Sequence, residues 1–169
     1  MKFHTVVIIF NPNSTGDSEK NAKELAEKIS HKSDQVKVEI IATKYAGHAE
    51  EIAATHSHDG GAVVVSSSGD GGYNEVINGV LLSKGQCSVA VLPSGNANDH
   101  HRAVGSDNLI ENILKGKTRR IETIKVESYK DDSSWERYAH SYVGFGLTPQ
   151  VGKVLTESRP NMIDRKSVV

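Results

Sequence analysis

The segment 62–78 constrains the fold of this chain more than any other, because it joins a buried strand to a helix through glycine. It begins with three consecutive valines, 63–65, a β-branched apolar run of the length of a buried strand. Residues 66–72 are serine, glycine and one aspartate, and apolar residues then recur over 76–81 at the spacing of one helix face. A strand, a glycine turn and a helix N-terminus present free backbone N–H groups and a positive dipole end to an anion. We expect that anion to be a phosphate.

Two common phosphate-binding motifs are excluded. The dinucleotide fingerprint G-x-G-x-x-G would begin at Gly69, but Asn74 stands at its third glycine. The P-loop pattern would end at 116–118, Gly-Lys-Thr, but Glu111 stands at its first glycine and a helical pattern precedes it instead of a strand. The glycine segment therefore belongs to neither motif.

Short apolar strands alternate with helical patterns through residue 114. This order predicts an α/β fold, a three-layer domain in which helices cover both faces of a mostly parallel sheet. We expect a helix cap at Asp17 or Ser18, another at Asp107, and a helix end at Gly116. The expected strands are 3–10, 36–41, 63–65 and 88–92.

The four loops that leave the carboxyl ends of these strands are rich in glycine, serine, threonine, asparagine or aspartate. In open parallel sheets such loops meet at one edge and form the ligand crevice. Their convergence strengthens the expectation of a ligand that carries phosphate. The loops are 11–16, 43–48, 66–72 and 93–99.

The composition restricts the function classes. A chain of 169 residues, 37% hydrophobic and 24% charged, is long enough to bury one core. The net charge of −1 gives no bulk attraction to nucleic acid, and we expect no such partner. The single cysteine, Cys87, excludes an internal disulfide, and no stretch reads as a membrane span or a signal peptide. We therefore expect a cytoplasmic protein.

The pattern changes after Arg119. Segments 120–127 and 135–145 read as extended strands on either side of the polar turn 130–134, which is typical of antiparallel structure. We expect residues 1–118 to form the α/β domain and residues 119–169 to be the beginning of a β-rich second domain that this chain does not complete. Strands without their sheet can pair between copies, so a homodimer is one expectation.

Side chains outside these loops give weaker signals. Adjacent histidines point to different sides of a helix, and no cysteine or carboxylate set accompanies them at metal-ligand spacing. We therefore expect solvated histidines and no metal ligand in this chain, an inert half-buried Cys87, and packing roles for Trp135 and Tyr138. The histidines concerned are His56, His58, His100 and His101.

Four motifs at the four strand ends resemble the diacylglycerol kinase catalytic domain, which bacterial lipid kinases and sphingosine kinases share and to which NAD kinases are more distantly related. The resemblance covers roughly residues 3–127, and a later match at 143–146 extends into the second segment. The motifs are Asn11-Pro12-Asn13-Ser14, Thr43 with Gly47-His48-Ala49, Gly69-Asp70-Gly71 with Asn74-Glu75, and Pro93-Ser94-Gly95 with Asn98-Asp99.

This resemblance implies an ATP-dependent lipid kinase that transfers a phosphoryl group to a lipid hydroxyl, with ATP and Mg²⁺ as cofactors. It implies that the nucleotide binds between the α/β domain and a β-sandwich, and that the lipid acceptor is met at the inner face of the membrane, where the protein would be peripheral. It also places the catalytic acid and the residues that organise Mg²⁺ in the second domain, beyond the end of this chain. This chain alone is therefore expected to be inactive.

Phosphoryl transfer requires a protein mainly to position ATP and acceptor and to stabilise the phosphoryl charge. Backbone N–H groups of the glycine segment are the expected phosphate donors, helped by hydroxyl groups on neighbouring loops. The expected cofactor-binding residues are Asn11, Pro12, Ser14, Thr15, Thr43, Ser68, Gly69, Asp70, Gly71, Gly72, Asn74, Glu75, Ser94, Gly95 and Asn96.

Asp70 is the expected catalytic residue. It either orients Mg²⁺-bound water, or takes the acceptor proton as the resemblance to sphingosine kinases implies, or only bonds its own turn. Asn74 and Glu75 either contact the ribose or hold the loop, and Glu75 is alternatively a simple first-turn carboxylate. We expect Asn98 and Asp99 to cap the helix after the fourth strand.

The chain departs from the family pattern in the glycine segment. The family usually has Gly-Gly-Asp-Gly-Thr where this chain has Ser68-Gly69-Asp70-Gly71-Gly72, so one glycine and one threonine hydroxyl are lost. The family also has threonine at Asn96 and usually phenylalanine at His100. These changes keep a second hypothesis open, a non-catalytic nucleotide-binding or regulatory module. A third is an NAD kinase-like enzyme, against which the lipid-kinase-like segment 93–99 argues.

Overall fold

The computed structural model describes residues 2–14, 16–105, 108–130, 133–147 and 150. Strands and helices alternate as far as β4, and two helices and a hairpin follow. In chain order the elements are β1 (Thr5–Phe10), α1 (Ser18–Lys32), β2 (Lys37–Ala42), α2 (His48–His56), β3 (Ala62–Ser68), α3 (Asp70–Leu82), β4 (Ser88–Pro93), α4 (Asp99–Val104), α5 (Leu109–Lys115), β5 (Ile124–Lys130) and β6 (Ser133–Ala139).

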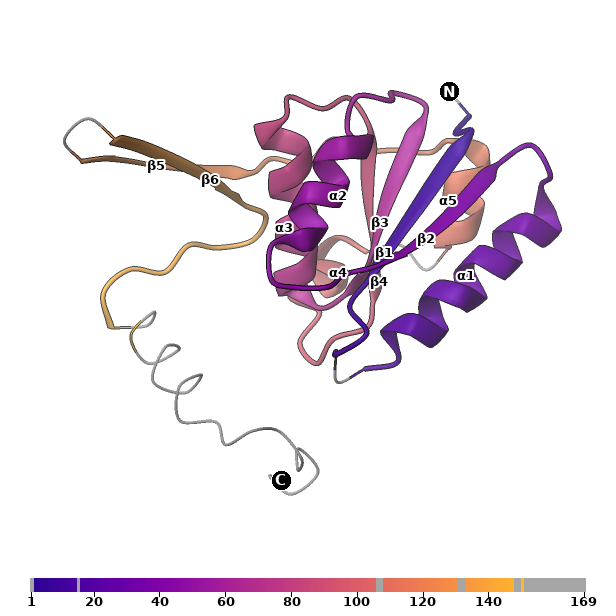
Figure 1. The fold of residues 1–169 in the computed structure, drawn as a ribbon, viewed down its shortest axis with the longest axis horizontal. Helices are drawn as coiled ribbons and strands as arrows, with labels where there is room; N and C mark the ends of the chain where they lie inside the picture. The colour runs from indigo at the N-terminus through magenta and orange to yellow at the C-terminus, as the bar shows by residue number, and fades with distance from the viewer. Residues whose placement is uncertain (1, 15, 106–107, 131–132, 148–149, 151–169) are drawn as a thin grey trace, which may run out of the picture.

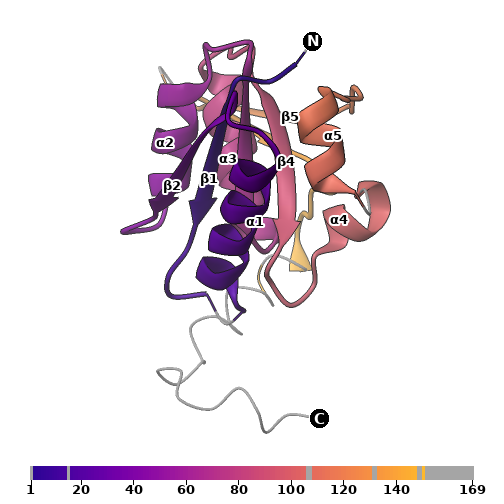
Figure 2. The ribbon, with the colours of Figure 1, turned by 90° about the vertical axis from the view of Figure 1, so that its right-hand side faces the viewer.

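Four parallel strands form the central sheet in the order β2-β1-β3-β4. Helices α1 and α5 cover one face of this sheet, and α2 and α3 cover the other (Figures 1 and 2). The expected three-layer α/β domain with a parallel sheet is confirmed. Within the described ranges, no helix combines the length and the apolar character needed to cross a membrane.

Alternate residues of β1 explain how the sheet holds both helix layers. Val6, Ile8 and Phe10 pack with α1 and α5, whereas Val7 and Ile9 pack with α2 and α3. All of them are at most 8% exposed, so β1 is a central strand without a solvated face. The more exposed residues of β2 and β4 fit the places of these strands at the two sheet edges.

The polar segment 66–72 is mostly not a loop. β3 continues through buried serines to Ser68, and α3 begins at Asp70, so only Gly69 lies between them. Ser66 and Ser68 bond each other at 2.6 Å, and buried hydroxyls satisfied in this way are compatible with a strand. The expectation of a loop over 66–72 is therefore wrong at both ends, because a serine-rich strand end has the composition of a turn.

Two expected helix caps are absent or undescribed. Neither Asp17 nor Ser18 caps α1 with its side chain, and the Ser18 hydroxyl instead donates to the carbonyl of Asn11 at 2.6 Å. Asp107 lies outside the described residues. The expected helix end is confirmed, because α5 stops at Gly116 in the left-handed conformation, with φ of 62°.

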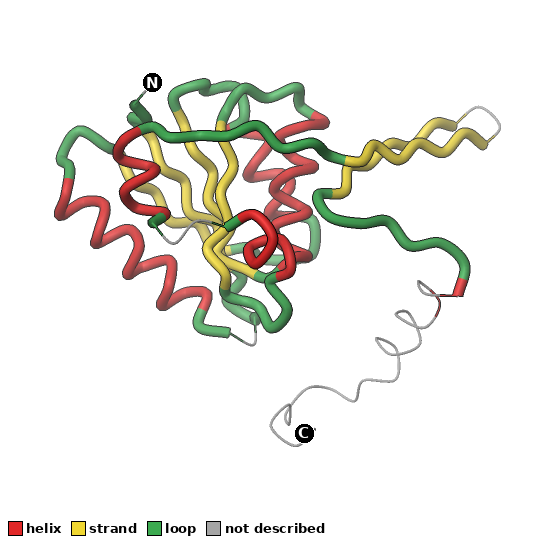
Figure 3. Tube along the Cα trace, turned by 180° about the vertical axis from the view of Figure 1, so that it is seen from behind, coloured by secondary structure: helices red, strands yellow, loops and turns green. Residues whose placement is uncertain are grey.

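β5 and β6 form an antiparallel hairpin that projects from the α/β body (Figures 1 and 3). The expected change to antiparallel structure is confirmed. Trp135 is 52% exposed, so the expectation that it packs is wrong in this structure. Tyr138, on the same strand, is half-buried at the base of the hairpin.

Asn78 of α3 holds the hairpin to the body. Its amide nitrogen donates to the carbonyl of Tyr138 at 2.8 Å, and its amide oxygen accepts from the N–H of Tyr138 at 2.9 Å. The side chain thus pairs with β6 as a neighbouring strand would. The same nitrogen donates to the carbonyl of Asn74, and Asn78 is only 1% exposed. An ion pair between Arg137 and Glu50 of α2 forms a second link.

Replacing Asn78 with alanine should detach β6 from α3. We expect the lost buried hydrogen bonds to lower the free energy of unfolding by about 1–3 kcal/mol, and the amide of Tyr138 to lose its protection from hydrogen exchange. Chemical denaturation and residue-resolved exchange measure the two effects. Gln35→Ala, which removes an exposed amide between α1 and β2, is the control. Unchanged exchange at Tyr138 would contradict the clamp.

Candidate functional site

A cavity of about 490 Å³ opens at the carboxyl edge of the sheet, among the loops that follow β1, β2, β3 and β4. The four loops therefore converge, and the cavity has the size of sites that bind small molecules and cofactors. The expected nucleotide-binding residues that line it are Asn11, Ser14, Thr43, Ser68, Gly69, Gly71, Gly72, Glu75, Gly95 and Asn96.

The other expected site residues lie elsewhere. Asp70 and Asn74 line a second hollow beside the hairpin. Pro12 is exposed and outside the lining of both cavities, and Thr15 lies outside the described residues. Ser94 is 5% exposed and is bonded among neighbouring polar side chains instead of lining the larger cavity.

A chain of hydroxyl groups fixes the loops after β1 and β4 relative to each other. The Ser94 hydroxyl accepts from the amide of Asn21 on α1 at 2.9 Å and lies 3.2 Å from the hydroxyl of Ser67 on β3. The Ser67 hydroxyl donates to the carbonyl of Ser18 at 2.8 Å, and Ser18 in turn donates to the carbonyl of Asn11. The loop after β4 is therefore connected through β3 and α1 to the loop after β1.

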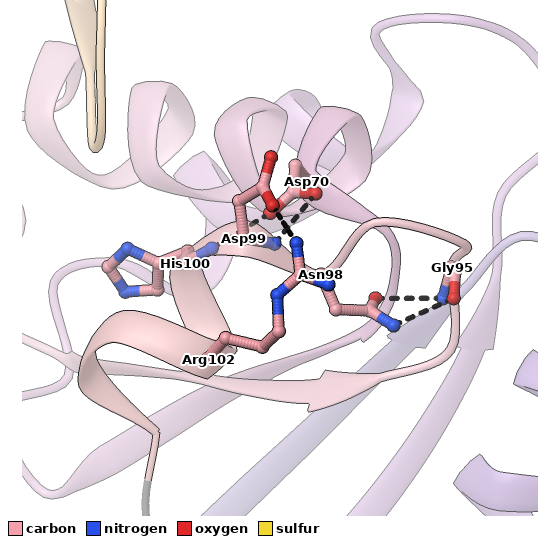
Figure 4. A network of polar contacts seen from close by, with 6 residues as sticks. All are labelled: Asp70, Gly95, Asn98, Asp99, His100 and Arg102. Atoms are coloured by element: carbon pink, nitrogen blue, oxygen red, sulfur yellow. Dashed lines mark hydrogen bonds and ion pairs between the residues drawn. The ribbon is translucent and has the colours of Figure 1, made fainter.

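The loops after β3 and β4 meet through two glycines. A Cβ at Gly95 would overlap the backbone of Gly69, and a Cβ at Gly69 would lie 3.2 Å from the Cα of Gly95. Asn98 closes the second loop, because its side-chain oxygen accepts from the N–H of Gly95 at 3.0 Å and its amide nitrogen donates to the Gly95 carbonyl at 2.7 Å (Figure 4). Asn98 thus occupies the N-cap position of α4 without capping that helix by its side chain.

The first turn of α3 supplies the anion-binding groups of the larger cavity. Gly69 is the N-cap, and the N–H of Tyr73 is the first to bond back, to the Gly69 carbonyl at 3.1 Å. The preceding N–H groups have no partner within the helix and lie at the positive end of its dipole. Gly71 has open space where a Cβ would stand, so an anion can approach this turn closely.

Asp70, the first residue of α3, connects this turn to α4. Its carboxylate oxygens accept from the N–H groups of Asp99 and His100, each at 3.1 Å, so Asp70 caps α4 from another element (Figure 4). Burial alone would raise the pKa of Asp70, but the two backbone donors, together with nearby His140, outweigh it and hold the pKa below its usual value. Such a carboxylate is a weak proton acceptor. Asp99 itself is ion-paired with Arg102 (Figure 4).

The second hollow, of about 200 Å³, lies where α3 and α4 meet the end of β6. It is lined by Asp70, Asn74, Asp99, Ala139, His140, Ser141 and Tyr142. His140 enters from the segment after β6, and its Nε2 lies 3.4 Å from the carbonyl oxygen of Asp70. The hollow therefore combines two carboxylates of the α/β body with an imidazole from the hairpin side.

Three rings form a cluster next to this hollow. The rings of Tyr73, His100 and His140 are in mutual contact, with centroids 4.5–5.0 Å apart. His100 is 4% exposed, so the expectation that it is solvated is wrong. Burial, and then His140, lower the pKa of His100 to about 4, and burial raises the pKa of Tyr73 to about 12. Both rings are therefore neutral near pH 7. Burial also raises the pKa of Cys87 to about 11, which agrees with the expected inert thiol.

The part of the chain that the structure describes contains no group of three or more histidine, cysteine or carboxylate side chains placed to hold a metal ion. Asp70 and Asp99 are already bonded within the protein, and Glu75 lines the larger cavity. Mg²⁺ is often held by one or two carboxylates together with substrate phosphates. Of these three carboxylates only Glu75 lines the larger cavity, so the described residues could meet Mg²⁺ that arrives with nucleotide phosphates but do not form a cage for the ion alone.

Some residues of both cavities carry no motif. Lys44 and Tyr45 line the larger cavity, and their signal in the sequence is only their place, directly after Thr43 at a carboxyl strand end. Asn13, which does belong to the first motif, and Ser66 of β3 also line this cavity, although neither is among the expected binding residues. His140 has no local signal, because only the docking of the hairpin brings it to Asp70.

A profile of the diacylglycerol kinase catalytic domain matches residues 5–126. The chain belongs to this family. The match covers all four strands of the sheet and the loops that line the larger cavity, and it ends within β5. The resemblance read from the four motifs is therefore confirmed.

Relatives of known name agree with this assignment. The diacylglycerol kinase of Staphylococcus aureus is 28% identical over 126 residues, which cover 72% of this chain and 39% of that protein. The diacylglycerol kinase of Staphylococcus saprophyticus is 32% identical over 91 residues, 52% of this chain and 30% of that protein. The chain thus spans well under half the length of these curated relatives. A crystal structure of a diacylglycerol kinase from Bacillus anthracis matches with a TM-score of 0.57 at 22% identity, over 83% of this chain and 62% of that one, which supports the fold.

Two departures from the family pattern face each other across the start of α3. A Cβ at Gly72 would lie 2.5 Å from the hydroxyl oxygen and 2.8 Å from the Cβ of Ser68. Ser68 therefore occupies the space that the family's threonine at position 72 would need, and the family has glycine at position 68. Since Ser68 also lines the cavity, a hydroxyl-bearing side chain is retained at this wall from the opposite side.

Gly72→Thr should overpack this wall and lower the free energy of unfolding by about 1–3 kcal/mol. Adding Ser68→Gly removes the obstruction, so the double variant should recover most of the loss although it carries more changes. Denaturant unfolding of the two single variants, the double variant and the unchanged chain measures the coupling between the two positions. A coupling free energy near zero would show that the two departures are independent.

The buried His100 should make the fold sensitive to acid. Its pKa is about 4 in the folded chain and near the ordinary 6.5 when unfolded, so the unfolded chain binds more protons between these values. The contribution of neutral His100 to the free energy of unfolding is fully present above pH 6.5 and is lost as pH falls toward 4. At pH 5 the loss reaches about 2 kcal/mol. His100→Phe should remove this part of the loss, measured by thermal unfolding at pH 7.5 and pH 5. His101→Phe is the neighbouring control, and an equal loss in His100→Phe and the unchanged chain would refute the assignment.

Proposed function

We propose that this chain is the nucleotide-binding portion of an ATP-dependent lipid kinase, which transfers the terminal phosphoryl group of ATP to a lipid hydroxyl. The observation that carries the proposal is the first turn of α3, whose free backbone N–H groups open into a cavity lined from all four strand ends. Membership of the diacylglycerol kinase family supports the reaction class. The activity of the whole protein is part of the proposal, because the chain matches only a fraction of its relatives.

The polyphosphate of ATP fits the donors of the larger cavity. In this proposal the N–H groups of the segment 69–72 bind phosphate oxygens, and Ser14, Thr43 and Asn96 supply further donors from neighbouring loops. Lys44, which follows Thr43 in the loop after β2, adds positive charge to the cavity. Mg²⁺ that arrives with the nucleotide would neutralise phosphate charge. Positioning and charge stabilisation of this kind are most of what phosphoryl transfer requires of a protein.

We retain Asp70 as the candidate catalytic residue, in an orienting role. It faces the second hollow, beside the hairpin, while the N–H groups of the next residues serve the larger cavity. An acceptor hydroxyl in this hollow would donate a hydrogen bond to a carboxylate that stays ionised and is held in place by α4. Asn74, on the same rim, would hold the acceptor side of the site, and Glu75 the nucleotide side.

We also propose that residues 1–118 are the nucleotide domain and that residues from 119 onward belong to a second, β-rich domain. The hairpin supports this proposal, because Ile124, Tyr129 and Trp135 expose large apolar surfaces on a sheet of only two strands. The lipid acceptor would be bound with the help of that domain, at a membrane surface on the cytoplasmic side. The present chain would then bind ATP without catalysing phosphoryl transfer.

Gly71→Asp should separate nucleotide binding from folding. Open space surrounds the Cβ position, and a carboxylate in the first turn is favourable to a helix, so the stability should stay the same or rise slightly. The same carboxylate repels a phosphate, and we expect the affinity for ATP with Mg²⁺ to fall more than tenfold, measured by calorimetric titration of this chain. Gly71→Asn introduces a side chain of the same shape without the charge, so it should weaken ATP binding much less.

Equal affinities of Gly71→Asp and Gly71→Asn would contradict a phosphate at the first turn of α3. If the unchanged chain bound no ATP, the nucleotide function itself would be wrong. A protein that contains this chain can then be tested for phosphorylation of diacylglycerol in vesicles. ATP binding without any turnover there would favour a non-catalytic nucleotide-binding module.

A further inference from the structure

We propose that Tyr45 is the stacking platform for the base of the nucleotide and that it sets a preference for purine over pyrimidine nucleotides. This inference rests on the proposed nucleotide function and assigns the part of the cavity that the phosphate donors leave unexplained. Tyr45 lines the larger cavity from the loop after β2, on an element separate from the first turn of α3. It is 55% exposed, so the ring is accessible to a ligand.

The ring of Tyr45 is held on one face. It stacks on the imidazole of His48 with the centroids 4.7 Å apart and the planes 27° apart. The His48 ring is itself fixed, because its Nδ1 accepts from the backbone N–H of Lys44 at 3.1 Å. One face of the tyrosine is therefore covered by His48, and in this proposal the base stacks on the opposite face.

The hydroxyl end of Tyr45 is also anchored. It donates to a carboxylate oxygen of Glu51 on α2 at 2.6 Å, and this hydrogen bond raises the pKa of Tyr45, so the phenol stays protonated. A ring fixed at its hydroxyl and along one face loses little further freedom when a planar group stacks on it. Aromatic platforms of this kind contribute strongly to the binding of nucleobases, and they favour the larger surface of a purine.

The rest of the cavity agrees with a base at this end. The backbone phosphate donors form the wall at the first turn of α3, whereas Tyr45 and Ala46, which follow Thr43 and Lys44, belong to the wall contributed by the loop after β2. Both walls belong to one cavity of about 490 Å³, which has room for a ligand that extends from one to the other. A triphosphate alone would have no need of the ring of Tyr45.

The test compares ATP, CTP and inorganic triphosphate as ligands of the unchanged chain, Tyr45→Ala and Tyr45→Phe, by calorimetric titration with Mg²⁺. Tyr45→Ala should weaken ATP binding by about 10- to 100-fold, in line with the loss of one stacked base, and should leave inorganic triphosphate within twofold. The preference for ATP over CTP should largely disappear. Tyr45→Phe keeps the ring and should stay within about threefold of the unchanged chain. Tyr129→Ala, which removes an exposed tyrosine of the hairpin, is the control.

Four outcomes overturn the proposal. If Tyr45→Ala leaves ATP binding unchanged, or weakens ATP and inorganic triphosphate equally, Tyr45 is not a base platform, and the proposed nucleotide function stands. If the unchanged chain binds ATP no better than inorganic triphosphate, the base has no site here. If the unchanged chain binds neither ligand, the proposed nucleotide function fails together with this inference. Thermal unfolding of each variant excludes a loss caused by misfolding.

Discussion

The carboxylate of Asp70 holds the arrangement of the site together, because it accepts the N–H groups of Asp99 and His100 at the start of α4. The N-termini of α3 and α4 both carry positive partial charge, and bringing two such ends together is unfavourable without an anion between them. Asp70 is that anion, and it belongs to the first of the two helices. As a result the first two N–H groups of α4 have a hydrogen-bond acceptor within the protein, and the N–H groups of the first turn of α3 remain for a ligand in the larger cavity.

This arrangement also explains why the loop after β4 has its shape. Gly95 lies so close to Gly69 that a Cβ at position 95 would overlap the Gly69 backbone, and Asn98 then turns the chain into α4 through its bonds to Gly95. The turn requires Asn98 in the left-handed region, with φ of 51°, which asparagine tolerates better than most residues. The close approach, the turn and the cap by Asp70 depend on one another.

Much of the fold follows from local patterns, because each is strong and short in range. The buried valines of β3 and the alternating apolar residues of β1 define central strands, and parallel order then brings the carboxyl-end loops to one edge. The cavity wall from Asn11 to Asn96 could therefore be anticipated as a set of loops. The boundary of β3 could not be anticipated, because the hydroxyl of Ser67 finds its partner, the carbonyl of Ser18 on α1, only in the folded chain.

Contacts between distant segments escape local patterns entirely. The sequence around His100 predicts a solvated histidine. In the folded chain the segment after the hairpin places His140 next to His100, and both rings pack with Tyr73. The amide of Asn78, which resembles any polar residue of a helix, is buried because it pairs with Tyr138. Since the same hairpin contributes His140 to the hollow at Asp70, the docking of β6 and the shape of the acceptor side are physically coupled.

The departures of the glycine segment from its family are better explained by compensation than by decay. A segment that had lost its role would accumulate changes independently, leaving a void where the threonine is missing or a clash where a glycine is replaced. Here the side chain of Ser68 fills the space beside Gly72 and bonds Ser66, and it still faces the cavity. Asn96, which replaces another threonine, lines the same cavity with an amide that can donate hydrogen bonds. Substitutions that keep this wall packed and polar agree with the proposed nucleotide cavity, and they argue against a segment that has lost its shape.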